Sequence, residues 1–128
     1  RSCRKYIDPK FEGDKTSTRP FLLRFSDVAL IYAEAAGPTA KAYELVNFIR
    51  SRAGLGDMKP NLGKDEFRRE ILKERTFELA FEGDHVYDLR RWNRITIDVP
   101  EAAELSEDQV TFYPIPQAEI NLNGSLRP

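Results

Sequence analysis

The stretch of residues 70–92, EILKERTFELAFEGDHVYDLRRW, combines apolar and charged residues more densely than any other part of the chain. Its apolar residues recur at about 100° per residue, which predicts an amphipathic helix that begins near residue 64. Gly83 is expected to end this helix, because glycine tolerates left-handed backbone, and Asp84 is expected to cap a second short helix. The apolar face of the longer helix holds Phe67, Ile71, Leu72, Leu79 and Phe81.

Glu74 and Glu78 project from nearly the middle of that apolar face, where an ordinary amphipathic helix has no carboxylates. An unpaired buried carboxylate is strongly destabilising, so both side chains are expected to meet cations or to line a wet cleft. We therefore predict a structural ion-pair network at this helix and its continuation. Its expected members are Glu74, Arg75, Glu78, Glu82, Arg90 and Arg91, with Arg50 and Arg52 as further candidate cations.

Paired carboxylates are also the machinery of glycoside hydrolysis, so a glycosidase that uses Glu74 and Glu78 stays open as an alternative. Such pairs flank a sugar, however, and two neighbours on one helix can hardly bracket a glycosidic bond. The sequence contains no nucleophile–base pair, phosphate-binding glycine loop or dinucleotide fingerprint. We therefore predict no catalytic residue.

Two further helices are predicted from the apolar spacing within residues 26–53. Ser26 is expected to cap the first of them, and the short connector at Gly37 makes the two helices antiparallel neighbours. The first helix presents Val28, Ile31, Tyr32 and Ala35 at helical spacing. The inner face of the second holds Ala42, Leu45, Val46, Ile49 and Ala53. Together with residues 64–93, this predicts an all-α fold of tetratricopeptide-like helix pairs.

The length of 128 residues favours a single domain, residues 1–128, and 41% hydrophobic residues suffice for a modest core. Residues 1–24 lack a sustained period and are expected to form an extended lead-in. Residues 25–95 are expected to form the helical core, and residues 96–128 an irregular extended tail. Within that tail, the prolines of TFYPIPQAEINLN predict a polyproline-like segment.

Composition excludes several classes of function. The formal charge of −1, from 20 basic and 21 acidic residues, argues against nucleic-acid binding and against a polybasic membrane surface. Cys3 is the only cysteine, so no disulfide framework or cysteine-rich metal site can form within the chain. Glu82 and His85 have the spacing of a bundle metal motif, but Gly83 interrupts the helix and the chain has one histidine. We predict no metal and no cofactor.

Three aromatic side chains are candidates for stacking against sugar rings: Tyr87, Trp92 and Tyr113. Tyr87 and Trp92 fall near the apolar stripe of a short helix, so packing in the core is the alternative for both. Sugar sites need several aromatic faces that converge with hydrogen-bonding groups, and no aromatic cluster occurs on one loop.

Four sequence blocks resemble, in this order, the C-terminal hallmarks of the SusD/RagB family. The blocks are RFSDVALIYAEAA, AYELVNFIRSRAGL, ILKERTFELAFEG…VYDLRRW and FYPIPQAEINLN, and they cover residues 24–123 with gaps. The run GDHVYD departs from the family's usual GHRWFD-like run at the corner between the last two predicted helices. In the third block, ILKERTFELAFEG…VYDLRRW, the residues that match the family are Glu74, Arg75, Glu78, Glu82, Gly83, Asp88, Leu89, Arg90 and Trp92.

The resemblance implies a role as well as a fold. Members are outer-membrane lipoproteins, exposed at the cell surface, that capture a glycan or another nutrient and pass it to a SusC-like TonB-dependent transporter. They are not enzymes. The resemblance also implies that this chain is the C-terminal helical scaffold of a longer protein. The lipid anchor and most of the ligand-contacting region of that protein are expected to precede Arg1. A free-standing tetratricopeptide-like adaptor for a protein partner is the alternative from another class.

Overall fold

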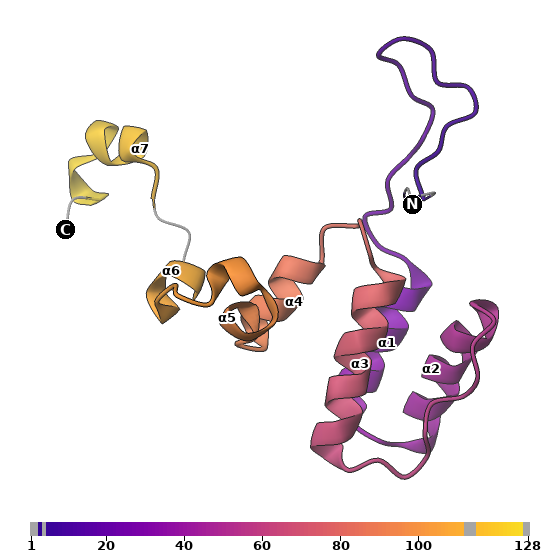
Figure 1. Cartoon of the computed structure of the whole chain (residues 1–128). Coiled ribbons are helices and arrows are strands. Elements are labelled where there is room, and N and C mark those ends of the chain that lie inside the picture. Colours follow the sequence, from indigo (N-terminus) through magenta and orange to yellow (C-terminus); the bar gives the residue numbers. More distant parts are fainter. Residues whose placement is uncertain (1–2, 4, 112–114, 127–128) are drawn as a thin grey trace. The chain divides into compact units, whose positions relative to one another are not determined.

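The computed structural model describes residues 3, 5–111 and 115–126 of the chain. Within these residues, helices are the regular elements and no strand forms, so the predicted all-α class is confirmed (Figure 1). The chain divides into two compact units, residues 1–85 and 86–128. The expectation that residues 1–128 form one domain stays a prediction.

The first unit is built on three helices, α1 (Phe25–Ala36), α2 (Ala40–Arg52) and α3 (Lys64–Glu78). Both α2 and α3 pack against α1, which gives the unit its core (Figure 1). The ring of Tyr43 meets that of Phe67 edge to face at 5.0 Å, which joins α2 to α3. The core consists of Ala29, Leu30, Ala33, Ala42, Val46, Ile49, Met58, Leu62, Phe67 and Ile71.

The buried face of α1 differs from the predicted one. Val28, Ile31 and Tyr32 are each close to half exposed, because the opposite side of the helix meets α2 and α3. The predicted cap is also wrong: Arg24 occupies the N-cap position, and Ser26 lies in the first turn. Because α1 is apolar on both sides, its spacing alone does not reveal which side packs inward. The residues that α1 buries are Ser26, Ala29, Leu30 and Ala33.

The end of α3 also departs from the prediction. The helix ends at Glu78 rather than at Gly83, and Phe81 follows with a φ of 66°. Phe81 therefore leaves the apolar face and is 75% exposed. The early turn brings Glu82 to within hydrogen-bonding distance of Arg24, a contact that a continued helix would have to replace. The rest of the predicted face is buried: Phe67, Ile71, Leu72 and Leu79.

The lead-in forms a loop that Asp8 closes. Its carboxylate accepts hydrogen bonds from the backbone N–H groups of Lys10 and Ser17, at 2.8 and 2.5 Å. The hydroxyls of Thr16 and Ser17 donate to the same carboxylate, each at 2.9 Å. These charge-assisted bonds replace regular structure in a segment that has no apolar period.

The second unit is a chain of short helices, and it includes one helix where an extended segment is predicted. Residues 117–122 are helical because Pro116, with a φ of −56°, suits the start of a helix. Residues 112–114 of the predicted polyproline-like segment lie outside the described part. The elements are α4 (His85–Arg91), α5 (Ile95–Asp98), η1 (Pro100–Ala102), α6 (Glu107–Thr111), α7 (Gln117–Leu122) and η2 (Gly124–Leu126). No helix of the described residues has the length and apolar character needed to cross a bilayer.

Candidate functional site: an aromatic cavity over an ion-pair network

The first unit contains a cavity of about 560 Å³, where the lead-in, α1, α2 and the end of α3 meet. Its volume lies within the range of small-molecule sites, roughly 300–1,000 Å³. We name it the aromatic cavity, because aromatic rings line its wall and charged groups line the remainder. Its lining residues are Lys5, Tyr6, Phe21, Arg24, Phe25, Ser26, Phe48, Arg52, Phe77, Glu78 and Glu82.

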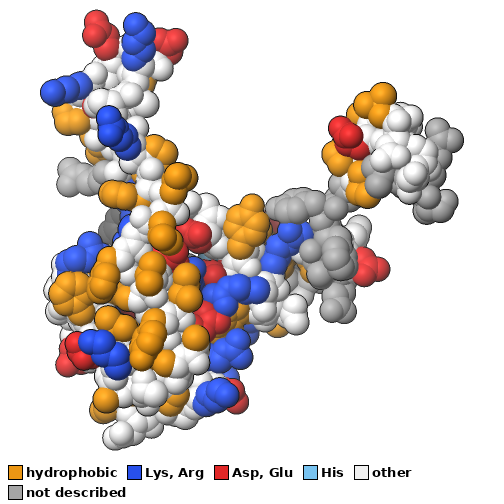
Figure 2. Space-filling view, turned by 180° about the vertical axis from the view of Figure 1, so that it is seen from behind, with side chains coloured by type: hydrophobic (Ala, Val, Ile, Leu, Met, Phe, Trp, Pro, Cys, Tyr) orange, Lys and Arg blue, Asp and Glu red, His pale blue; other side chains and the backbone are white. Residues whose placement is uncertain are grey.

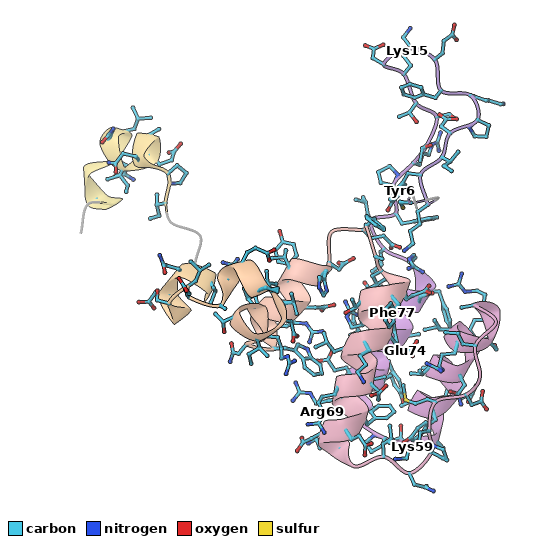
Figure 3. The ribbon with its side chains drawn as sticks, in the orientation of Figure 1. Tyr6, Lys15, Lys59, Arg69, Glu74 and Phe77 are labelled. Atoms are coloured by element: carbon cyan, nitrogen blue, oxygen red, sulfur yellow. The ribbon has the colours of Figure 1, made fainter. Side chains whose placement is uncertain are left out.

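The aromatic wall comes from four separate parts of the chain: Tyr6, Phe21 with Phe25, Phe48 and Phe77. The four phenylalanines are each more than half exposed. The rings of Phe25 and Phe48 meet edge to face at 5.7 Å, so α1 and α2 together hold this part of the wall. Figure 3 shows Tyr6 at the base of the lead-in loop and Phe77 toward the C-terminal end of α3. Hydrophobic side chains also gather on the surface of the helical part (Figure 2).

Arg24 is the centre of the ion-pair network that lines the rest of the same cavity. Its Nε and Nη2 donate to the two carboxylate oxygens of Glu82, at 2.7 and 2.9 Å, a bidentate arrangement. Its Nη1 donates to the carboxylate of Glu78, and its Nη2 also donates to the Glu78 carbonyl oxygen. The side chains of Glu78 and Glu82 are 11% and 6% exposed. The start of α1 is thereby fastened to the end of α3.

Two more cations complete the network. Lys5 donates to the Glu82 carboxylate at 2.5 Å and to the Glu78 carbonyl oxygen at 2.6 Å. These bonds attach the lead-in to the C-terminal end of α3. Arg52, the last residue of α2, pairs with the Glu78 carboxylate through Nη2. One carboxylate pair thus holds together four segments of the first unit.

These contacts set the protonation of the network. Burial raises the pKa of Glu78, but hydrogen bonds from Arg24 and Ser26 outweigh burial and bring that pKa below its ordinary value of 4.5. Burial likewise raises the pKa of Glu82, and Arg24 and Lys5 reverse the effect. Burial lowers the pKa of Arg24, but the hydrogen bonds to Glu82 and Glu78 raise that pKa by a larger amount, so Arg24 stays charged. Glu78, Glu82 and Arg24 are therefore all charged at neutral pH.

The other predicted network residues on α3 make ion pairs of their own. Glu74 pairs with Arg50 of α2. Arg75 donates from Nη1 to the carboxylate of Asp27 on α1, at 2.8 Å. Glu74 and Arg75 are both buried, so these contacts join α3 to both of its neighbours at the level of the core.

Arg90 and Arg91, the remaining predicted members, lie in the second unit. Arg90 donates from Nε to the carbonyl oxygen of Val110 at 2.7 Å. Arg91 donates to the carboxylate of the buried Asp88, at 2.7 and 2.9 Å. That all six predicted residues act as one structural network stays a prediction.

Of the predicted sugar-stacking candidates, the two that the structure describes, Tyr87 and Trp92, do not line the aromatic cavity. Tyr87 is 62% exposed in the second unit, which does not fit the packing alternative for this residue. Trp92 is half-buried, and the guanidinium of Arg91 lies 5.6 Å from the centre of its ring. Tyr113 lies outside the described residues.

Sequence reasoning missed Arg24 and Lys5. One signal for Arg24 was present, because a cation directly before a helix opposes the helix dipole and calls for a carboxylate partner. Lys5 carries no such signal, since it lies in a lead-in without periodicity. No group of three or more His, Cys, Asp or Glu side chains in the described part of the chain is arranged to hold a metal ion.

The chain resembles known proteins along nearly its whole length. Residues 1–127 match the model of the SusD family. SusD-like protein P2 from Formosa agariphila is 33% identical over 133 residues, which cover 91% of this chain and 26% of that protein. SusD-like protein P25 from the same organism is 34% identical over 125 residues, which cover 86% of this chain and 23% of that protein.

A solved structure gives the same result for the fold. The crystal structure of a SusD homolog from Bacteroides thetaiotaomicron matches with a TM-score of 0.74 and 31% identity. The match covers 89% of this chain and 27% of that chain. The chain therefore spans about a quarter of the length of the proteins it matches.

Proposed function

Because the chain belongs to the SusD family, we propose that it is the helical scaffold of a protein that binds a glycan or another nutrient for uptake. The observation that carries this proposal is the family match over residues 1–127. The ion pairs support a scaffold role, since they join the lead-in, α1 and α2 to the C-terminal end of α3. Such a junction of several segments holds a surface in place for a ligand or a partner.

The full protein would act at the outer membrane, exposed at the cell surface and held there by a lipid anchor outside this chain. Its partner would be a SusC-like TonB-dependent transporter, to which it delivers the captured nutrient. The family supports the general role in nutrient uptake, and the anchor, the partner and the delivery step are parts of our proposal.

The ionised carboxylates of the site support a protein that binds its ligand without catalysis. A glycosidase needs one carboxyl group with a raised pKa as its general acid. Glu78 and Glu82 have the opposite shift, because Arg24, Lys5 and Arg52 hold both as carboxylates. Glu74 is likewise engaged by Arg50. We therefore propose no hydrolytic role for the α3 carboxylates.

The proposal is tested in cells that carry the complete reading frame together with a SusC-like barrel transporter. We expect the two proteins to purify together, and deletion of the binding protein to abolish growth on its glycan. Incubation with that glycan should release no reducing sugar. Normal growth after the deletion, or release of sugar by the purified protein, would contradict the proposed function.

A further inference from the structure

Phe48 and Arg52 both line the aromatic cavity, where they place an apolar ring beside a cation. They lie four residues apart on α2, so their side chains share one side of the helix, with Cβ atoms about 5–6 Å apart. Phe48 is 57% exposed, and its edge contact with Phe25 fixes the ring. A ligand ring whose apolar face stacks on Phe48 would therefore place a substituent within reach of Arg52.

Arg52 has donors left for that substituent. Its guanidinium carries five N–H groups, and its contact with a described residue is the one with Glu78. Its side chain remains 55% exposed, in contrast to the 18% of Arg24. The planar fork of an arginine matches a carboxylate, which accepts two parallel hydrogen bonds from it.

The charge of the cavity favours the same ligand. Three basic side chains, Lys5, Arg24 and Arg52, face two carboxylates, which leaves one positive charge in excess. The carboxylates of Glu78 and Glu82 already accept bonds from these cations, so they offer little to the hydroxyl donors of a neutral sugar. A cavity of this kind attracts an anion that also presents an apolar ring face.

We propose that the aromatic cavity is itself a binding site for an acidic saccharide. The apolar face of a uronate ring stacks on Phe48, and its carboxylate binds Arg52. The inference rests on the proposed function for the general class of ligand. It goes beyond that function by placing a sugar site within these 128 residues and by assigning its charge.

Calorimetric titration of the 128-residue chain with tetragalacturonate tests the site. The matched ligand is the methyl ester of the same oligosaccharide, which keeps the rings and removes the negative charge. We expect measurable binding of the acid, and binding of the ester at least about tenfold weaker, since a charge-assisted bidentate contact is lost. The affinity for the acid should fall as the salt concentration rises.

Variants separate the two halves of the contact. Arg52→Gln should weaken binding of the acid about tenfold and leave binding of the ester unchanged. Phe48→Leu should weaken both ligands alike, because it removes the stacking surface. Arg52→Lys keeps the charge and the pairing with Glu78 and loses the fork, so its affinity should lie between those of Arg52→Gln and the unchanged chain.

Matched controls come from exposed residues outside the cavity. Arg69→Gln removes one positive charge from the far part of α3 (Figure 3), and Phe11→Leu removes one exposed ring from the lead-in loop. Neither control should change the affinity by more than about twofold. Circular dichroism of each variant verifies that the helices are retained.

Three results would overturn the inference. These are equal binding of acid and ester, loss of binding in Arg69→Gln as large as in Arg52→Gln, and no binding of the acid by the folded chain. In the last case the exposed phenylalanines would be a surface for packing against protein. None of these results touches the proposed uptake function, which the deletion of the complete gene tests separately.

Discussion

The two ends of α3 are stabilised by different interactions, apolar burial at the N-terminal end and ion pairs at the C-terminal end. The N-terminal half buries Phe67 and Ile71, both fully inaccessible, in an apolar core with α1 and α2. At the C-terminal end, Glu78 and the nearby Glu82 meet Arg24 in a cavity that exposed rings also line. The first end is stabilised by the amount of apolar surface it buries. The second depends on the geometry of a few charged contacts, which makes it the more specific and the more easily disturbed end.

Truncation of a phenylalanine at each end should give the largest contrast. Phe67→Ala removes a fully buried ring and should lower the free energy of unfolding by about 3–5 kcal/mol. Phe77→Ala removes a ring that is 75% exposed and should change it by less than about 1 kcal/mol. Urea denaturation followed by circular dichroism measures both. Equal losses would mean that Phe77 is packed in solution and that the two ends do not differ.

Loss of one carboxylate from the network should come next. Glu78→Ala leaves Arg24 and Arg52 without a shared partner and should cost about 2–4 kcal/mol. The matched control is Glu44→Ala, which breaks the exposed pair with Lys41 on α2 and should cost less than about 1 kcal/mol. If thermal melting of Glu78→Ala equals that of the control, the carboxylate is exposed and the network is not a source of stability.

Acid should weaken the charged end before the apolar one. The folded pKa values of Glu78 and Glu82 lie below 4.5, so the stability they contribute is complete above that pH. This stability is lost as the pH falls through the lowered pKa values of the folded state. The reason is that, in this pH range, the unfolded chain binds more protons than the folded chain. The double variant Glu78→Gln, Glu82→Gln should lose part of this acid dependence. An identical dependence of stability on pH below 4.5 in both proteins would contradict the shift.

The smallest effect is expected in the lead-in. The backbone N–H groups of Lys10 and Ser17 lower the pKa of Asp8 to about 2, so its carboxylate stays charged across ordinary conditions. Asp8→Ala should shift the amide resonance of Ser17 and speed proteolysis within residues 9–16, with no change in the melting temperature. A lower melting temperature would mean that the loop contributes to the stability of the helices.

The contrast between the ends of α3 also separates what the sequence could predict from what it could not. The buried faces of α2 and the first half of α3 mostly followed from apolar spacing, since Val46, Ile49, Phe67 and Ile71 are inaccessible. Ala53 was predicted on the same face of α2, but it occupies the C-cap position and is exposed. The face of α1 did not follow, because its exposed Val28 is as apolar as its buried Leu30. Periodicity identifies a face only when the opposite face is polar.

The site shows the same limit in sharper form. The need of Glu78 for a cation could be predicted from its place on an apolar face, but its partner Arg24 lies 54 residues earlier. Lys5 reaches Glu82 across 77 residues. The rings of the aromatic cavity come from four segments, so no single loop of the sequence displays them together. Contacts at such separations depend on the tertiary fold and leave no local pattern.

A double-mutant cycle between Arg24 and Glu82 tests most directly that specific charged contacts hold the end of α3. The free energies of unfolding are measured for the unchanged chain, Arg24→Ala, Glu82→Ala and the double variant. We predict a coupling energy of about 1–3 kcal/mol, as expected for a bidentate, largely buried pair. Additive effects, with a coupling below about 0.5 kcal/mol, would show that the pair does not hold this end and would contradict the account.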